Sequence, residues 1–194
     1  MPPRGPQRIY LIGFSGSGKS LIGSKLASRL KLPFYDTDTI IEQEAGQSIA
    51  AIFEKSGESR FRSMESRIIG RLCRGRHSRG LAAVGGGAFQ SRVNREYLLE
   101  SGLVVYLSCS VEEIYRRLRD KKDRPLLDVR PRETETLREA RMRRIRRLLA
   151  RRLRNYRKAH IHCSTTRKDA NTVMQELLVK IRRYHAQGHD RAAT

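Results

Sequence analysis

The 194-residue sequence has no tryptophan, only three cysteines and no long apolar run, and each shortage argues against a class of protein. The cysteines are odd in number and far apart, which argues against a disulfide framework and suits a reducing compartment. No segment approaches the roughly eighteen apolar residues that a membrane span needs. Residues 1–7 also lack the apolar stretch of a secretory signal, so we expect a disordered leader, a cytoplasmic location and no membrane partner.

Acidic residues are also scarce, because 20 aspartates and glutamates face 41 lysines and arginines, for a net charge of +21. The excess is concentrated in residues 138–158, where ten arginines and Lys158 accompany only Glu139. Apolar residues three or four apart, from Met142 to Tyr156, predict an amphipathic helix there. We interpret its basic side first as a solvated surface. Without zinc-finger spacing or an aromatic RNA-binding cluster, the charge does not predict nucleic-acid binding, although it does not exclude it.

Short apolar strands alternate with helices along the chain, which is typical of a parallel α/β fold with helices on both faces of the sheet. Strands are expected at 8–12, 33–38, 81–84, 103–107 and 160–164, and helices at 19–30, 39–55, 58–73, 91–101, 111–119, 138–158 and 169–184. The charged stretch 120–133 contains two prolines and is expected to be a mobile loop. We therefore predict a single domain over 8–184 and a disordered tail at 185–194.

Residues 13–20, Gly-Phe-Ser-Gly-Ser-Gly-Lys-Ser, match the P-loop pattern G-x-x-x-x-G-K-[ST] between a predicted strand and a predicted helix. The glycines let the backbone wrap around phosphates, and the helix N-terminus adds its positive end. Lys19 is expected to reach the β- and γ-phosphates, and Ser20 to ligate Mg²⁺. The motif predicts an ATP-dependent phosphotransferase, and we expect its acceptor to be a small molecule.

Asp36 and Asp38 are two apart on a segment expected to be extended, so both carboxylates should leave the same face. One would hold the water shell of Mg²⁺, and the other would orient the attacking hydroxyl or accept its proton. A structural alternative is that this Asp-Thr-Asp sequence caps the next helix, with Asp38 at the N-cap.

Three further features are candidate ligand contacts: a glycine triplet after a predicted strand, an arginine on a predicted helix and an arginine in a predicted loop. Residues 85–87 are three glycines, which permit close approach of the backbone to a ligand. Arg62 lies on a helix that is apolar at 61, 64 and 68, and taken alone it is typical of a surface charge. Arg124 lies in the predicted loop, from which it would close onto the transferring phosphate.

Taken in order, these residues resemble those of a shikimate kinase. The shared pattern is G-x-x-G-x-G-K-S at 13–20, F-x-D-x-D at 34–38, Phe-Arg at 61–62, Gly-Gly-Gly at 85–87, Arg-Pro-Leu-Leu at 124–127 and Arg152 four residues before Tyr156. The resemblance covers about residues 8–184. It implies a nucleoside-monophosphate-kinase-like fold with a five-stranded parallel sheet, a substrate-binding helical excursion at about 38–73 and a lid at about 120–133.

The resemblance also implies an activity and the residues that perform it. ATP would phosphorylate the 3-hydroxyl of shikimate, giving shikimate 3-phosphate for chorismate and aromatic amino-acid biosynthesis. Apart from the resemblance, we expect the protein to be a monomer. Asp38, Lys19 and Arg124 would be catalytic, and Ser20 and Asp36 would bind Mg²⁺. The nucleotide would contact Gly16, Ser17, Gly18, Lys19, Ser20, Leu21, Arg117 and Arg124. Shikimate would contact Asp38, Arg62, Gly85, Gly86, Gly87 and Arg152.

The sequence departs from the family pattern near its C-terminal end. The proline of the family's Arg-x-Pro-x-Tyr is missing from residues 152–156, and Arg151 adjoins Arg152, which leaves open which arginine binds the carboxylate. The adenine-contacting loop would fall near 167–168 and is not assigned. Two alternatives are a gluconate kinase and a non-catalytic sensor. The carboxylate-binding arginine pair favours shikimate over gluconate, and the intact P-loop and aspartates argue against lost catalysis.

Overall fold

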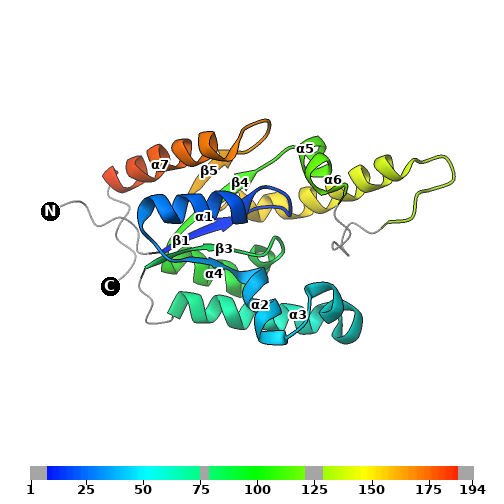
Figure 1. Cartoon of the computed structure of the whole chain (residues 1–194), viewed down its shortest axis with the longest axis horizontal. Helices are drawn as coiled ribbons and strands as arrows, with labels where there is room; N and C mark the ends of the chain where they lie inside the picture. The colour runs from blue at the N-terminus through cyan, green and yellow to red at the C-terminus, as the bar shows by residue number, and fades with distance from the viewer. Residues whose placement is uncertain (1–7, 75–78, 121–128, 188–194) are drawn as a thin grey trace.

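A parallel sheet of five strands forms the centre of the molecule in the computed structural model, which describes residues 8–74, 79–120 and 129–187 (Figure 1). Its strand order is β2-β3-β1-β4-β5, and every neighbouring pair is parallel. The strands are β1 (Arg8–Ile12), β2 (Phe34–Asp36), β3 (Gly80–Ala83), β4 (Leu103–Ser108) and β5 (Ile161–Ser164). Helices cover both faces, which confirms the predicted fold class.

The helices follow the predicted order, with two local differences. They are α1 (Lys19–Leu30), α2 (Thr37–Ala45), α3 (Ile49–Arg74), the 3₁₀ turn η1 (Ala88–Gln90), α4 (Arg92–Ser101), α5 (Val111–Leu118), α6 (Leu137–Tyr156) and α7 (Ala170–Ala186). The expected helices 39–55 and 58–73 are wrong in their division, because the chain breaks at 46–48 and only kinks at Gly57 (φ 77°, ψ 171°). α7 continues two residues past the expected domain end.

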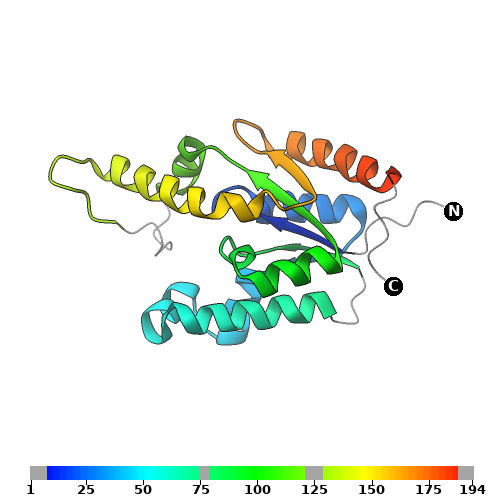
Figure 2. The same ribbon diagram turned by 180° about the vertical axis from the view of Figure 1, so that it is seen from behind.

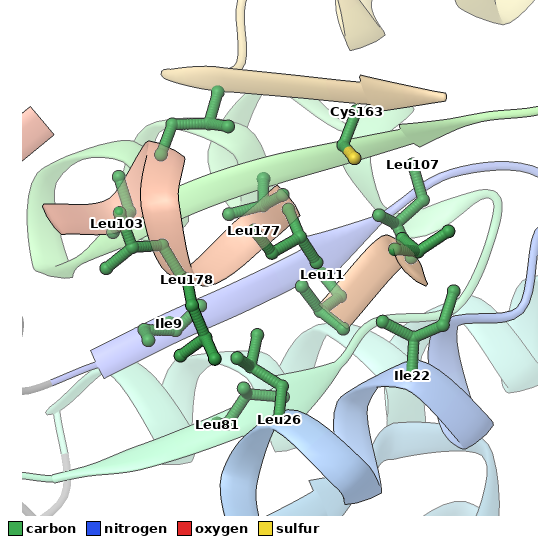
Figure 3. Packing of buried hydrophobic residues seen from close by; sticks show 14 of the residues in the cluster. Ile9, Leu11, Ile22, Leu26, Leu81, Leu103, Leu107, Cys163, Leu177 and Leu178 are labelled. Atoms are coloured by element: carbon green, nitrogen blue, oxygen red, sulfur yellow. The ribbon is translucent and has the colours of Figure 1, made fainter. Parts of the chain in front are cut away.

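One face of the sheet is covered by α1 and α7 (Figure 3). Leu11 of β1 lies on this face with Leu26 of α1 and Leu177 of α7, and all three are fully buried. α1 stays helical because its apolar residues recur at helical spacing and leave the opposite side polar. This layer fixes the strand that leads into the P-loop and the helix that leaves it.

The opposite face is covered by α4, α6 and the second half of α3 (Figure 2). Tyr156 of α6 is fully buried there and stacks on Tyr106 of β4, with ring centroids 4.9 Å apart and planes 24° apart. α2 and α3 form a smaller apolar cluster of their own, which includes Ile41, Ile52 and Ile68. The excursion between β2 and β3 therefore has its own apolar core next to the sheet.

The carboxyl ends of three adjacent strands bring the predicted motifs to one edge of the sheet. β3 lies between β1 and β2, with Ala83 opposite both Leu11 and Asp36. The P-loop follows β1, Asp36 ends β2, and residues 85–87 follow β3. Ligands of open parallel sheets bind outside this edge. None of the helices in the described ranges is both long and apolar enough to cross a membrane.

The buried layer under α1 generates a stability prediction. Leu26→Ala should lower the free energy of unfolding by about 2–5 kcal/mol, because it leaves a cavity among fully buried neighbours. Leu21→Ala is the control from the same helix, since Leu21 is 60% exposed and should change stability by less than about 0.5 kcal/mol. Urea denaturation without nucleotide measures both values. Equal losses in the two variants would contradict the packing assignment.

Candidate active site

The P-loop backbone is shaped by glycines with positive φ angles. Gly16 and Gly18 have φ angles of 81° and 92°, a conformation that favours glycine. A side chain at Gly13 would also collide with the carbonyl oxygen of Leu107, at 2.5 Å from the added Cβ. Lys19 Nζ donates to the carbonyl oxygens of Gly13 and Phe14, at 3.1 and 3.2 Å. The lysine ammonium is therefore bonded to carbonyl oxygens of the P-loop itself.

Ser20 and Asp36 lie side by side at the start of α1 and the end of β2. Ser20 Oγ donates to Asp36 Oδ2 at 2.5 Å, and the other carboxylate oxygen accepts from the Asp38 amide at 3.0 Å. Asp36 is thus the N-cap of α2 and Asp38 lies in its first turn. The expectation of one extended segment through Asp38 is wrong, because this cap starts the helix at Thr37. The capping alternative is correct in kind, but the capping residue is Asp36.

These groups open onto a cavity of about 360 Å³. Its walls come from the P-loop, the end of β2, α2, α3, the turn 85–87 and α6. The lining residues are Phe14, Ser15, Lys19, Ser20, Asp36, Asp38, Thr39, Glu42, Ser48, Ile49, Ala50, Phe53, Phe61, Arg62, Glu65, Gly85, Gly86, Gly87 and Arg152.

The turn of residues 85–87, called the glycine turn below, is held close to its surroundings on every side. The Gly85 amide donates to Thr37 Oγ1 at 2.9 Å. A Cβ on Gly85 would lie 2.4 Å from Glu65 Oε1 and 3.0 Å from Asp38 Oδ1. A Cβ on Gly86 would lie within 3.2–3.3 Å of P-loop backbone atoms. Glycine is required here because the backbone itself forms the wall of the cavity.

Arg62 of α3 is fixed by two glutamates and an aromatic ring. Its Nη1 donates to Glu65 Oε2 at 2.7 Å, and its Nη2 donates to Glu58 Oε1 at 3.0 Å. The guanidinium lies over the Phe61 ring, 5.0 Å from its centroid. Arg62 Nε also donates to Glu58 Oε1, at 3.2 Å. A guanidinium has five N–H donors, and these three bonds use three of them. The remaining donors leave room for an anionic ligand at a pre-positioned group.

Glu65 is a buried carboxylate that the sequence reasoning missed. It is 1% exposed, and within the described part of the chain its Oε1 has no hydrogen-bond partner. Burial raises the pKa of Glu65, and the nearby Asp38 raises it further, while Arg62 opposes both effects. The available signal was an acidic residue within the otherwise apolar spacing 61, 64 and 68 of a predicted helix.

Arg152 and Tyr156 extend from α6 to the same carbonyl oxygen. Arg152 Nη1 donates to Gly86 O at 3.2 Å, and the Tyr156 hydroxyl also donates to Gly86 O. Burial raises the pKa of Tyr156 to about 12, so its hydroxyl keeps the proton that it donates. Arg152 lies over the Phe14 ring, 5.3 Å from its centroid. Arg151, by contrast, is exposed and does not line the cavity.

Arg117 lies on the other side of the P-loop. Its Nη1 donates to Gly16 O at 3.1 Å, and its Nη2 donates to Thr165 O at 2.9 Å. Glu113 accepts from Arg117 Nε at 2.8 Å, which fixes the guanidinium against the loop. The predicted nucleotide residues Gly16, Ser17, Gly18, Leu21 and Arg117 do not line the cavity itself. Arg124, and with it most of the expected lid, lies outside the described residues, as do 1–7 and 188–194.

The arrangement combines a phosphate-binding loop with a polar acceptor pocket. Ser20 and Asp36 supply two adjacent oxygen ligands, which fits Mg²⁺ because it is commonly held by one or two protein oxygens plus substrate phosphates. The described residues contain no cluster of three or more His, Cys, Asp or Glu side chains suited to a metal ion. Asp38 faces the pocket without being part of that pair. The geometry suits transfer of a phosphoryl group to a small hydroxylated anion.

Comparisons with known proteins agree with this geometry. The family model described as shikimate kinase matches residues 15–182. The shikimate kinase of Chlorobium chlorochromatii is 40% identical over 92% of this chain and 93% of its own length. The shikimate kinase of Acinetobacter baumannii, solved in complex with shikimate, superposes with a TM-score of 0.82 at 37% identity, over 93% of this chain and 95% of that one. A gluconokinase from Sinorhizobium meliloti, at 22% identity and a TM-score of 0.58 over 96% of this chain and 99% of its own, shares the fold alone.

The buried carboxylate generates a pH prediction. The folded protein holds the Glu65 proton to a higher pH than the unfolded chain, because burial raises its pKa. Between the two pKa values the folded state binds more protons, so the free energy of unfolding falls as pH rises through that window. Glu65→Gln removes this dependence, and the stability difference should shift in favour of the variant as pH rises from about 4 to 7.

Urea denaturation across that range measures the difference. The matched control is Glu58→Gln, which removes the 57% exposed partner of the same arginine. The buried carboxyl would not titrate as its surroundings indicate if the stability difference from the wild type followed the same pH trend in both variants, or did not change with pH in Glu65→Gln.

Proposed function

The chain belongs to the shikimate kinase family and uses ATP to phosphorylate shikimate, and we propose that the transfer takes place in the cavity described above. The acceptor is the 3-hydroxyl, and the product is shikimate 3-phosphate. The observation that carries this proposal is the pairing of Arg62 and Arg152, from two different helices, across a cavity that also contains Lys19 and Asp38. Two arginines suit the single carboxylate of the ring acid.

The two arginines bind the shikimate carboxylate and fix the ring. Each guanidinium lies over an aromatic ring, Phe61 for Arg62 and Phe14 for Arg152, so its plane is set before the substrate arrives. Planar, pre-oriented donors lose little freedom on binding a carboxylate. The glycine turn presents backbone groups to the same ligand at close range, because its residues carry no side chains.

Asp38 orients the attacking hydroxyl and accepts its proton as the new bond to the γ-phosphorus of ATP forms and the bond from that phosphorus to the bridging oxygen breaks, releasing ADP. Support comes from its position in the first turn of α2, beside the glycine turn and facing the cavity. Lys19 exchanges its carbonyl partners for phosphate oxygens of the nucleotide and stabilises the charge that develops during transfer. Positioning of the two substrates and electrostatic stabilisation together supply almost all of the acceleration in such a reaction.

Mg²⁺ is the cofactor that we propose, held by Ser20 and Asp36, and when bound it would neutralise phosphate charge. Support comes from the 2.5 Å contact between these two oxygen ligands beside the P-loop. The nucleotide contacts residues 16–21 and Arg117, whose guanidinium already bonds to the loop. A role for Arg124 in closing over the phosphates, a monomeric state and a cytoplasmic location stay predictions.

The proposed role of Asp38 predicts a selective loss of turnover. Asp38→Asn should lower kcat by about 10²–10⁴-fold, because the amide cannot accept the proton. The Kd for ATP should stay within about twofold, since Asp38 does not belong to the P-loop. Coupled kinase assays and nucleotide titration measure the two quantities.

Glu42→Gln is the matched control for this test. Glu42 also contributes a carboxylate to the cavity wall, but it accepts a bond from the Ile49 amide and is assigned no step. Near-normal kcat in Asp38→Asn, or an equal loss in Glu42→Gln, would remove Asp38 from the mechanism.

The proposed carboxylate clamp predicts a different result for two adjacent arginines. Arg152→Gln should raise the KM for shikimate by about 10–100-fold, because a hydrogen bond to a charged group contributes about 1.5–3 kcal/mol. The KM for ATP should change little. Arg151→Gln should behave as the wild type, since that side chain is exposed. Steady-state kinetics with each substrate varied in turn decides between them, and a reversed order would move the clamp to Arg151.

A further inference from the structure

The outward side of α6 carries a row of basic side chains that the kinase reaction does not use. Arg147, Arg151, Arg154 and Lys158 follow one another at intervals of four, three and four residues, so they share one side of the helix and its continuation. All four are exposed. We call them the basic row. Arg152, one residue away from Arg151, lines the cavity on another side of the helix.

The basic row gathers four cationic side chains without an acidic partner among the residues that the structure describes on one side of a helix, whereas several other arginines of the protein are paired. Arg62, Arg117 and Arg143 each form an ion pair with a nearby glutamate. Within the described ranges, no hydrogen bond or ion pair involves the four side chains of the row. The sequence from 140 to 168 contains no aspartate or glutamate at all. Like charges at this spacing destabilise a helix, so the row is not explained by the stability of α6.

The inward side of α6 is already occupied. Ile145 and Leu148 pack with α5, and Tyr156 packs under the sheet face shared with α4 (Figure 2). No large hydrophobic residue between 140 and 158 is exposed. A ligand of the basic row must therefore bind through charge on a rigid helix, without inserted apolar side chains.

This chemistry selects among polyanionic partners. Amphipathic helices that bind membranes insert their apolar side into the lipid, and that side of α6 is buried in the protein. Arginine is also common in protein interfaces, but there it usually accompanies an apolar or aromatic centre, and no large hydrophobic residue of 140–158 is exposed to provide one. Nucleic acid needs neither, because phosphate contacts alone supply non-specific affinity. We propose that the basic row binds the phosphate backbone of nucleic acid, in addition to the kinase activity.

The dimensions and the overall charge fit this partner. Seven positions of α6 from Arg147 to Arg154 correspond to about 10 Å of helix at 1.5 Å per residue, and Lys158 extends the row just past the end of the helix. A nucleic-acid duplex presents a negative charge about every 1.7 Å along its axis, so several phosphates fall within that length. The protein's net charge of +21 attracts such a polyanion at long range. The row provides the local site at which the contact is made.

The test compares two variants of the full chain with equal charge changes. The row variant carries Arg147→Gln, Arg151→Gln, Arg154→Gln and Lys158→Gln, which keeps good helix formers in α6. The control variant carries Arg29→Gln, Lys55→Gln, Arg60→Gln and Arg182→Gln, all at exposed positions on other helices. Binding of a labelled RNA oligonucleotide and a labelled DNA duplex is measured by fluorescence anisotropy between about 50 and 200 mM salt.

The wild type should bind both oligonucleotides, with an affinity that falls steeply as salt rises. The row variant should lose about tenfold or more in affinity at the lowest salt. Its slope of log affinity against log salt should shrink by about 3, since each phosphate contact contributes about 0.7–0.9. The control variant should keep most of the wild-type affinity at the lowest salt and most of the wild-type salt slope. Both variants should keep the wild-type KM for shikimate, and the row variant should melt no lower than the wild type.

Three outcomes would overturn the proposal. The first is no binding of either oligonucleotide by the wild type. The second is an equal loss in the two variants, which would assign the binding to net charge alone. The third is binding to phosphatidylglycerol vesicles but not to the oligonucleotides, which would make the row a membrane contact.

Discussion

The close approach of the glycine turn to the P-loop is the constraint on which the rest of the site depends. A Cβ on Gly86 would lie 3.2 Å from Gly13 O and 3.3 Å from Ser15 N, and backbone atoms cannot move aside as a side-chain tip can. The contact exists because β1 and β3 are hydrogen-bonded neighbours, and the Val84 amide still donates to Leu11 O beyond the ladder. The phosphate donor and the hydroxyl acceptor are thereby held at a fixed separation, and positioning of this kind is the main resource of a phosphoryl-transfer enzyme.

α6 supports the same turn from the other side, and helical geometry explains how so basic a helix does so. Each residue turns the helix by about 100°, so Arg152 and Tyr156, four apart, point inward while Arg151 points out. Tyr156 combines burial, stacking on Tyr106 and a bond to Gly86 O, so one side chain links the sheet to the turn. Asn155 adds a bond from Nδ2 to Gln90 Oε1 at 2.8 Å. These tertiary contacts add to the turn's own backbone bonds, from the Ala88 amide to Gly85 O and from the Gln90 amide to Gly87 O, both at 3.0 Å.

The sequence predicted the parts of the fold that depend on local pattern. The five strands, the P-loop and the glycine turn follow from apolar runs and glycine spacing, and the sheet order brings them together as parallel topology requires. The local pattern gave the wrong prediction at Asp36, where an extended segment was expected through Asp38 but the Asp36 side chain caps α2 and starts the helix at Thr37. It also missed the roles of Thr37 and Glu65, which depend on partners 48 and 20 positions away in the chain. Of these two, only Glu65 was detectable in the sequence, as an acid in an apolar spacing. Tyr156 was recognised as part of the pattern that it forms with Arg152, but its bond to Gly86, 70 positions away, was not predicted.

The charge of the cavity lining differs in sign from the overall charge of the protein. Lys19, Arg62 and Arg152 are its basic side chains, and Asp36, Asp38, Glu42 and Glu65 are its acidic ones. A pocket for ATP and a carboxylate thus carries a slight negative excess inside a chain of net charge +21. Bound Mg²⁺ would offset part of the negative charge that the lining carboxylates and the substrates bring together. The exposed arginines of α6 do not line the cavity and contribute nothing to this local balance. The surplus is concentrated instead on the outward side of α6, where neither substrate binding nor helix stability accounts for it.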